Sequence, residues 1–170
     1  MEFLPITSAE DHRVQEIYAS YTTTFPVDEQ RDKEQFEGLF SNPYVKFMSV
    51  IHDSEAIGYL ILWELSSFVF VEHFEVFEAF RSKKLGSHIM NHLSETYPNI
   101  ILEIEPAEQS EDASRRYSFY QRNNFSLIDT THVQPSYGEG KKSLNLWLLA
   151  NYTPENVEEA KKEIHNIIYR

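Results

Sequence analysis

Residues Asn99–Glu105 constrain the fold most, because their sequence, Asn-Ile-Ile-Leu-Glu-Ile-Glu, is apolar at nearly every central position. Such a run is typical of a central strand that is buried on both faces of its sheet. A helical pattern from Leu85 to Tyr97 precedes it, and before that helix lies another apolar stretch, Phe68–Phe77. This order predicts a β-α-β unit whose crossover makes the two strands a parallel pair.

The chain before this unit has the pattern of an antiparallel meander. Strands are predicted at Tyr44–His52, Glu55–Leu65 and Phe68–Phe77, with short turns between them. A short apolar segment, Glu2–Ile6, predicts an additional strand at the edge of the sheet. The front half of the chain is therefore expected to be antiparallel, in contrast to the parallel pair that follows.

Helical spacing of apolar residues predicts two helices before the meander. The first runs from Ala9, with Ser8 as its N-cap, to the residue before Pro26. The second, more polar helix is predicted over Asp28–Phe40. Further along the chain, Ser110 is expected to cap another helix, because acidic residues follow it in the first turn.

The C-terminal part completes an α/β fold with a mixed, mainly antiparallel central sheet. Two more strands are predicted at Phe125–Val133 and Ser143–Ala150, and Thr153-Pro154 is expected to open a last amphipathic helix. We predict one domain over residues 1–152, with residues 153–170 packed on it as that helix. The apolar face of the helix either caps the sheet or supports a dimer, so a monomer and a homodimer are both open.

Composition excludes several classes of protein. The chain has 170 residues, 15 basic against 27 acidic, a formal net charge of −12 and no cysteine. The absence of cysteine excludes disulfides, thiolate metal sites and a cysteine nucleophile, and the acidic balance argues against a nucleic-acid partner. The N-terminus lacks a secretory pattern, and the longest apolar stretch, Ala56–Trp63, is too short for a membrane span. We therefore predict a cytoplasmic protein without a membrane partner.

One helix start has charge of the sign that the helix dipole disfavours. The run Arg81-Ser82-Lys83-Lys84-Leu85-Gly86 places three cations there, whereas the start at Ser110-Glu111-Asp112 is acidic. A bound phosphate would resolve the conflict, because backbone amides, dipole and cations would all face it. A solvated basic turn is the other interpretation. The run lacks the glycines of a Walker A loop or a dinucleotide fingerprint, which disfavours ATP and NAD.

Two segments resemble motifs of the GCN5-related N-acetyltransferase (GNAT) superfamily. Arg81-x-x-Lys84-x-Gly86, opening a helix five residues after a strand, is similar to the family's acetyl-CoA pyrophosphate loop, Gln/Arg-x-x-Gly-x-Gly/Ala. Phe119–Phe125 resembles the family's Phe-Tyr-x-x-x-Gly-Phe segment, and Gln134–Leu149 is similar to a bacterial subset whose substrates are mostly unassigned. The order of elements over roughly Phe3–Ala150 also agrees. The resemblance implies a GNAT-like sheet with two splayed strands.

Two positions depart from the family's motifs. Lys84 and Asn124 each stand where the family usually has glycine. Lys84 keeps the amide donor and adds a positive charge, so pyrophosphate binding is still expected. Asparagine tolerates the left-handed conformation of a helix C-terminus better than most residues, so the turn at Asn124 is expected to form.

The resemblance implies an acetyl-CoA-dependent N-acetyltransferase that transfers acetyl directly to a primary amine of a small molecule. The backbone of Phe74–Val76 would grip the pantetheine and thioester, with the Val76 amide as oxyanion donor, and Arg115 or Arg116 would add charge near the adenosine phosphate. The residues expected to bind acetyl-CoA are Phe74, Val76, Arg81, Ser82, Lys83, Lys84, Leu85, Gly86, Ser87 and Arg116. The motif also implies that Tyr120 is the acid that protonates the leaving thiolate; without the motif, Tyr120 would be interpreted as a packing aromatic.

The general base is open at this point. Strand alternation places Phe70, Glu72, Phe74 and Val76 on one face, and His73 and Glu75 on the other. Glutamates on this strand serve as bases in several family members, so Glu72 and Glu75 are the candidate catalytic residues, with Glu72 slightly preferred. His73 is a further candidate, and water could serve instead. Each of these side chains could also be a solvated or salt-bridged surface group.

The acceptor and two rival functions also stay open. The acceptor could be a small molecule or a peptide, and an acidic cluster that begins at Glu103 and Glu105 could favour a cationic one. The same fold could act on proteins, or bind acyl-CoA without turnover. His88 and His92 lie four residues apart, but no third ligand is evident, so no metal site is predicted.

Overall fold

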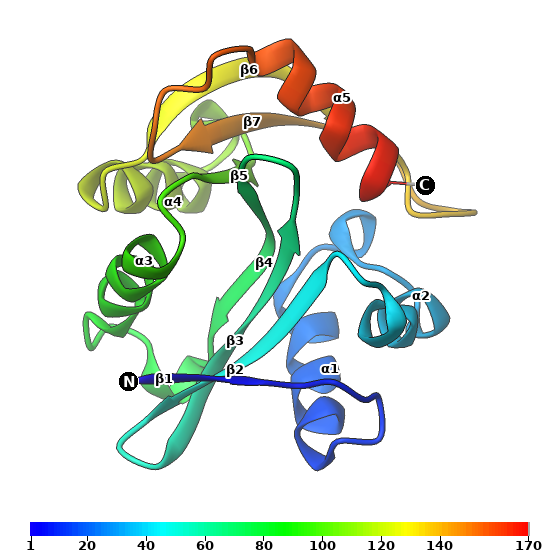
Figure 1. Ribbon diagram of the computed structural model, residues 1–170, viewed down its shortest axis with the longest axis vertical. Coiled ribbons are helices and arrows are strands. Elements are labelled where there is room, and N and C mark those ends of the chain that lie inside the picture. Colours follow the sequence, from blue (N-terminus) through cyan, green and yellow to red (C-terminus); the bar gives the residue numbers. More distant parts are fainter. Residues whose placement is uncertain (170) are drawn as a thin grey trace.

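The computed structural model describes residues 1–169, which form a seven-stranded sheet flanked by helices on both faces (Figure 1). The strand order is β1-β2-β3-β4-β5-β7-β6. The strands are β1 (Glu2–Pro5), β2 (Val45–His52), β3 (Glu55–Glu64), β4 (Val69–Val76), β5 (Ile100–Ile104), β6 (Ser126–Gln134) and β7 (Leu144–Ala150). The α-helices are α1 (His12–Thr24), α2 (Lys33–Gly38), α3 (Leu85–Thr96), α4 (Glu111–Arg122) and α5 (Val157–Ile167). None of the helices within residues 1–169 has the length and apolar character needed to cross a membrane.

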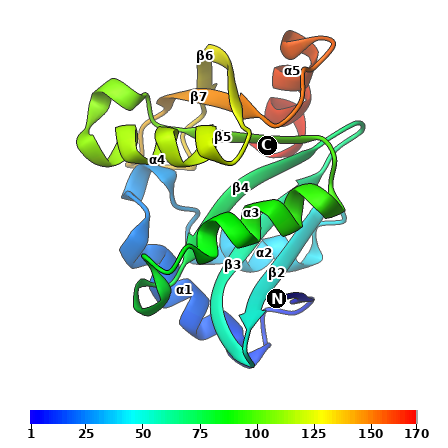
Figure 2. The same cartoon turned by 90° about the vertical axis from the view of Figure 1, so that its left-hand side faces the viewer.

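The topology confirms the predicted sheet. Strands β1 to β4 pair antiparallel in sequence order, β4 and β5 are parallel with α3 as the crossover, and β7 lies antiparallel between β5 and β6. The view in Figure 2 shows α3 and α4 in front of the sheet, whereas α1 and α2 lie behind it. The α/β class, the edge strand and the β-α-β unit are as the sequence predicted.

Two apolar cores lie on the two faces of the sheet. The core beneath α1, α2 and α5 is rich in aromatic side chains, among them Tyr21, Phe36, Tyr59 and Trp63. The core beneath α3 and α4 is mostly aliphatic. Ala160 and Ile164 of α5, and Ile168 directly after the helix, belong to the aromatic core, so α5 packs against it.

A β-bulge in β4 changes the faces that alternation predicted. Ile61 pairs with His73 and Leu62 pairs with Val71, so Glu72 is an extra residue on β4. Phe70 lies in the core beneath α1, whereas Phe74 and Val76 pack toward α3 and α4. The prediction that these three share one face with Glu72 is therefore wrong, because the bulge shifts the alternation by one residue.

The second predicted helix is also wrong in its first part. Asp28–Phe40 divides into a short 3₁₀ turn at Val27–Glu29 and helix α2 at Lys33–Gly38. Between them Gln30 is extended, and the Arg31 guanidinium reaches the sheet interior, where it pairs with a buried carboxylate. Asp32 then starts α2 with a capping box. A long-range ion pair has overridden local helical spacing here.

Helix caps follow the expected chemistry but not always at the expected residue. Ser110 caps α4, as predicted, by accepting a hydrogen bond from the Ala113 amide. Helix α1 is capped by Asp11 instead of Ser8, and α5 by Asn156, so Thr153-Pro154 lies outside the last helix. Aspartate and asparagine are as effective as serine at this position, so sequence alone did not discriminate between neighbouring candidates.

Gly58 permits the close approach of β3 and β4 near the end of β4. A Cβ at this position would lie 2.1 Å from the Glu75 carbonyl oxygen. We expect Gly58→Ala to lower the free energy of unfolding by about 1–3 kcal/mol, the usual cost of overpacking. Gly38→Ala is the matched control, because nothing lies within 4 Å of its Cβ position, and it should change stability by no more than about 1 kcal/mol. Urea unfolding measures both, and equal effects would contradict this account.

Candidate functional site

The parallel strands β4 and β5 separate shortly after they meet. They pair only through Val69–Val71 and Ile100–Leu102, so the second half of β4 is not paired with β5. A cavity of about 340 Å³ occupies the space between the diverging strands. Its walls are formed by the ends of both strands, the segment that follows α1, and the last turns of α4. The splayed strands implied by the family resemblance are therefore present.

A second cavity, of about 540 Å³, lies between the end of β4 and the start of α3. It shares Phe74, Val76, Arg81 and Phe119 with the first cavity, so the two cavities are adjacent along the end of β4. Most of the predicted acetyl-CoA residues line this second cavity: Phe74, Val76, Arg81, Ser82, Lys84, Leu85, Gly86 and Ser87. Lys83 lies beside them, with its Nζ 5.3 Å from the centre of the Phe80 ring.

The loop before α3 has the backbone conformation of an anion site. Ser82 and Lys84 both have left-handed φ angles, +63° and +60°. Turns of this kind direct backbone N–H groups toward a common point, and the first amides of a helix lack partners within the helix. The left-handed φ of Lys84 also explains the family's preference for glycine at this position, because a side chain is strained there.

Gly86 brings α3 close to α4. A Cβ on Gly86 would lie 3.3 Å from the Phe119 ring, closer than side chains ordinarily pack. Phe119 is the neighbour of Tyr120, so this contact fixes the distance between the loop at the start of α3 and the proposed acid. Gly86 is therefore needed for packing between helices.

The arginines of this region differ in location. Arg81 donates from Nε to the Val76 carbonyl oxygen at 2.9 Å, which ties the loop to the end of β4. Arg116 forms an ion pair with Glu105 and lines the first cavity, and it is Arg122 that lines the second. Arg116 therefore lies apart from the residues of the second cavity, and its role near the adenosine phosphate stays a prediction. Arg115 pairs with acidic residues at the surface of α4.

Tyr120 is buried in the wall of the first cavity. The C-terminus of its helix is closed as the sequence predicted: Asn124 has φ +66°, and the Phe125 amide donates to the Tyr120 carbonyl oxygen at 3.0 Å. Burial raises the pKa of Tyr120 to about 12, with Arg116 acting in the opposite direction. The phenol is therefore protonated at neutral pH.

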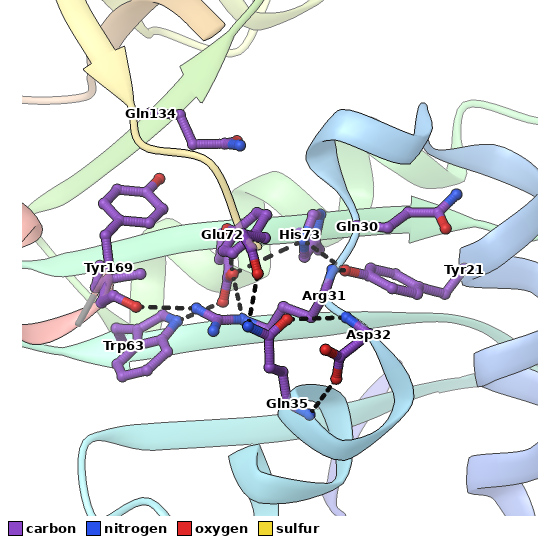
Figure 3. Close-up of polar contacts among 12 residues, drawn as sticks. Tyr21, Gln30, Arg31, Asp32, Gln35, Trp63, Glu72, His73, Gln134 and Tyr169 are labelled. Atoms are coloured by element: carbon purple, nitrogen blue, oxygen red, sulfur yellow. Dashed lines mark hydrogen bonds and ion pairs between the residues drawn. The ribbon is translucent and has the colours of Figure 1, made fainter. Parts of the chain in front are cut away.

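Glu72 lies on the opposite face of the sheet from Tyr120, at the centre of a buried network (Figure 3). Its Oε1 accepts from Arg31 Nε at 2.8 Å and from the Tyr137 hydroxyl at 2.7 Å, and its Oε2 accepts from Trp63 Nε1 at 2.6 Å. Burial alone would raise the pKa of Glu72, but Arg31 and these donors hold it below its usual value. Glu72 is salt-bridged, as one alternative had it, but the expected surface location is wrong because the carboxylate is fully buried. Its bonded carboxylate is poorly suited to accept a further proton.

Glu75 is also buried, and its contacts tie β4 to α1. Oε1 accepts from Ser20 Oγ at 2.8 Å, from Thr24 Oγ1 at 2.7 Å and from Arg81 Nη2 at 3.3 Å. Oε2 is enclosed and has no hydrogen-bond partner within residues 1–169. Glu75 therefore connects the helix that covers one face of the sheet to the phosphate loop.

His73 is enclosed by aromatic rings. Its Nε2 lies 3.4 Å from the Tyr21 hydroxyl, and the rings of Tyr21 and Phe25 pack against its imidazole. Burial lowers the pKa of His73 to about 4, although the neighbouring Glu72 acts to raise it. The imidazole is therefore neutral at physiological pH.

Several site residues were not found by sequence reasoning. Arg31, Tyr137 and Gln134 are buried at or near the first cavity, and Glu29 forms part of its wall. Arg31 and Glu29 fall within the predicted helix Asp28–Phe40, and Tyr137 falls between the two last predicted strands, with no role assigned to it. Their roles depend on contacts between segments about 40 to 140 residues apart, for which the sequence had no local signal.

The splayed strands and the two adjacent cavities are typical of an acetyl-CoA-binding transferase, and comparison with known proteins agrees. A family model described as Acetyltransferase (GNAT) family matches residues 12–125, more than half of the chain. The chain therefore belongs to the GNAT acetyltransferase family.

Individual relatives support this assignment. The Bacillus subtilis (strain 168) protein YjbC is 26% identical over 164 residues, covering 89% of this chain and 80% of the relative. A solved GNAT-family structure from Bacteroides thetaiotaomicron superposes with a TM-score of 0.92 at 28% identity, covering 99% of this chain and 98% of the other. An Elizabethkingia anophelis GNAT structure with acetyl-CoA bound has a similar fold, with a TM-score of 0.61 at 13% identity over 89% of this chain and 97% of the other.

The buried His73 makes stability depend on pH. Its folded pKa, about 4, is below the ordinary value of 6.5, so between these values the unfolded chain binds more protons and stability falls as pH falls. We expect a loss of about 2 kcal/mol between pH 6.5 and pH 5 from this residue. Urea unfolding across this range should show a flatter profile for His73→Gln, whereas His12→Gln at an exposed position should keep the wild-type slope. Identical slopes in all three proteins would contradict the assignment.

Proposed function

We propose that this GNAT protein is an acetyl-CoA-dependent N-acetyltransferase that transfers the acetyl group directly to a primary amine. The observation that supports this most is the pair of adjacent cavities that follow β4 from Tyr120 to the phosphate loop at the start of α3, where β4 is not paired with β5. A long cofactor with a phosphate at one end and a thioester at the other matches this shape.

The residues around the two cavities fit coenzyme A. Amides of the loop at Ser82 and Lys84 and at the start of α3 would bind the pyrophosphate, with positive charge from Lys84 and Arg122. The backbone of Phe74–Val76, which pairs with β3 but not with β5, would hold the pantetheine chain along its free edge, and we assign the Val76 amide as oxyanion donor. The bound cofactor supplies an activated acyl carbon. The Elizabethkingia structure with acetyl-CoA, similar in fold, is consistent with this assignment.

Tyr120 is proposed as the acid that protonates the departing thiolate. It lies in the wall of the first cavity next to Phe119, which lines both cavities. Its raised pKa keeps the proton on the phenol until a thiolate develops nearby. The hydroxyl makes no hydrogen bond to another group within residues 1–169, so its proton is free to be donated.

We further propose that the acceptor is a small, cationic primary amine. The first cavity has a modest volume, about 340 Å³, and carboxylates of Glu29 and Glu105 form part of its wall. Negative charge in a confined cavity attracts an ammonium group. A peptide acceptor would require a wider opening, and the assays below separate the two with amines of both kinds.

Tyr120→Phe tests the acid role. We expect kcat for thiol release from acetyl-CoA to fall by about 100-fold or more, the typical contribution of general acid catalysis, while the dissociation constant for acetyl-CoA stays near the wild-type value. Tyr117→Phe, the same change one turn earlier on α4, is the control and should leave kcat unchanged. Normal turnover by Tyr120→Phe would remove Tyr120 from the mechanism. A protein that binds acetyl-CoA but releases no thiol with any amine would instead be a binding protein.

The charge of the phosphate loop gives a separate test. We expect a Lys83→Glu/Lys84→Glu double variant to raise the KM for acetyl-CoA by about 10-fold or more, because each charge-assisted hydrogen bond contributes about 1.5–3 kcal/mol. Lys33→Glu, at an exposed position on α2, should leave KM unchanged. Steady-state kinetics at low ionic strength measures both, and an unaltered KM in the double variant would contradict phosphate binding at this loop.

A further inference from the structure

Five carboxylates line the first cavity, and one of them differs from the other four in its contacts. Glu72 and Glu75 are bonded to side chains beyond the cavity, as described above. Glu103 accepts a hydrogen bond from the Tyr169 hydroxyl at 2.6 Å, and its other oxygen lies 2.8 Å from His132 Nε2. Glu105 is paired with Arg116. Each of these four carboxylates has a partner that holds at least one of its oxygen atoms in place.

Glu29 is the fifth carboxylate and differs from the others. Its side chain forms no hydrogen bond or ion pair with any residue of the described chain. It is half-buried and forms part of the cavity wall together with Tyr120 and Glu105. A carboxylate that is partly withdrawn from water and has no partner is available to an incoming ligand.

The segment that bears Glu29 is held firmly over the cavity. The Gln134 side chain donates from Nε2 to the Asp28 carbonyl oxygen at 3.0 Å, and the Lys142 amide donates to Asp28 Oδ1 at 2.9 Å. On the other side of Glu29, the Lys141 ammonium contacts the Gln30 carbonyl oxygen. The β6–β7 connection thus fixes both neighbours of Glu29, so its carboxylate is positioned before any ligand arrives.

From this geometry we propose that Glu29 is the general base that removes a proton from the acceptor ammonium group. This inference rests on the proposed acetyl transfer and adds a catalytic residue that the family motifs do not identify in this chain. Glu29 and Tyr120 come from different elements, the turn after α1 and the end of α4, and both face the space between the splayed strands. A base and an acid on separate walls of one cavity suit acetyl transfer, because the amine nitrogen loses protons and the departing thiolate gains one.

The proton balance is complete with these two residues. Glu29 takes one proton from R–NH₃⁺, which leaves R–NH₂. The nitrogen lone pair forms the new N–C bond with the acyl carbon, and the C–S bond breaks with its electron pair on sulfur. Tyr120 gives its proton to the thiolate and recovers one from the nitrogen, which becomes a neutral amide. Glu29 then releases its proton to solvent, so the overall products are amide, thiol and one H⁺.

The electrostatic environment of Glu29 suits this role. Burial first, and then the Glu105 carboxylate, raise the pKa of Glu29 to about 7, whereas Arg116 acts to lower it. A base whose pKa lies near the working pH combines a useful deprotonated fraction with strong proton affinity. The titratable or charged groups that line the same cavity or neighbour Glu29 are Asp28, Glu72, His73, Glu75, Arg81, Glu103, Glu105, Arg116, Tyr120 and Lys141.

The test compares Glu29→Gln with Glu34→Gln, an identical change at an exposed position on α2. Thiol release from acetyl-CoA is followed with ethylenediamine, spermidine, tyramine and an alanine-led tetrapeptide as acceptors, between pH 5.5 and 9.5. For the wild type and Glu34→Gln, we expect kcat/KM to rise through an apparent pKa near 7. For Glu29→Gln, we expect this rise of kcat/KM with pH to disappear and kcat/KM at pH 7 to fall about 100-fold. An active wild type whose Glu29→Gln variant keeps both rate and pH profile would overturn the proposal.

A second measurement does not depend on turnover. Titration of the side-chain carboxyl ¹³C signals, with the Glu29 signal assigned by its loss in Glu29→Gln, should give a pKa near 7 in the free protein. A value near 4 would overturn the role of Glu29 as base even if acetyl transfer is confirmed. Failure of the wild type to bind acetyl-CoA by calorimetry would instead overturn the proposed function, so the two failures are distinguishable.

Discussion

The buried ion pair between Glu72 and Arg31 is the interaction on which the arrangement of the site depends. Both side chains are almost fully removed from water, and each charge would be costly there without the other, so loss of one partner typically destabilises a protein by about 3–5 kcal/mol. Arg31 also donates to the Ile168 carbonyl oxygen, and Tyr137 donates to Glu72. The turn after α1, the bulge in β4, the β6–β7 connection and the end of α5 therefore meet at one carboxylate.

This network explains why the two faces of β4 have different roles. Glu72 and His73 are consecutive in sequence, yet the bulge directs both side chains toward the aromatic core. Glu72 is hydrogen-bonded there, and His73 is enclosed by aromatic rings. The following residues, Phe74 and Val76, then face α3 and α4 along the proposed cofactor path. The bonded polar groups thus lie on one side of β4, and the other side lines the proposed cofactor path.

The same network holds the turn that bears Glu29 close to the divergence of β4 and β5. Arg31 follows Glu29 by two residues, and its amide donates to the Tyr21 hydroxyl at 2.6 Å while its guanidinium binds Glu72. A short turn fixed at both ends can present a carboxylate to a cavity with little loss of conformational entropy on ligand binding. The buried ion pair therefore helps to position the proposed base.

Local patterns in the sequence predicted the elements, and they grouped most of the residues that line the second cavity, because these features depend on neighbours in the chain. The apolar run before Glu105, the basic start of α3 and the turn at Asn124 all have local signatures, and the structure has the strand, helix and turn there. Tertiary structure decided the β4 bulge, the burial of Arg31 and Glu72, and the exposure of Glu29 to the cavity. These features arise from pairing between strands and from contacts between distant segments. Local periodicity in the sequence does not reveal such contacts.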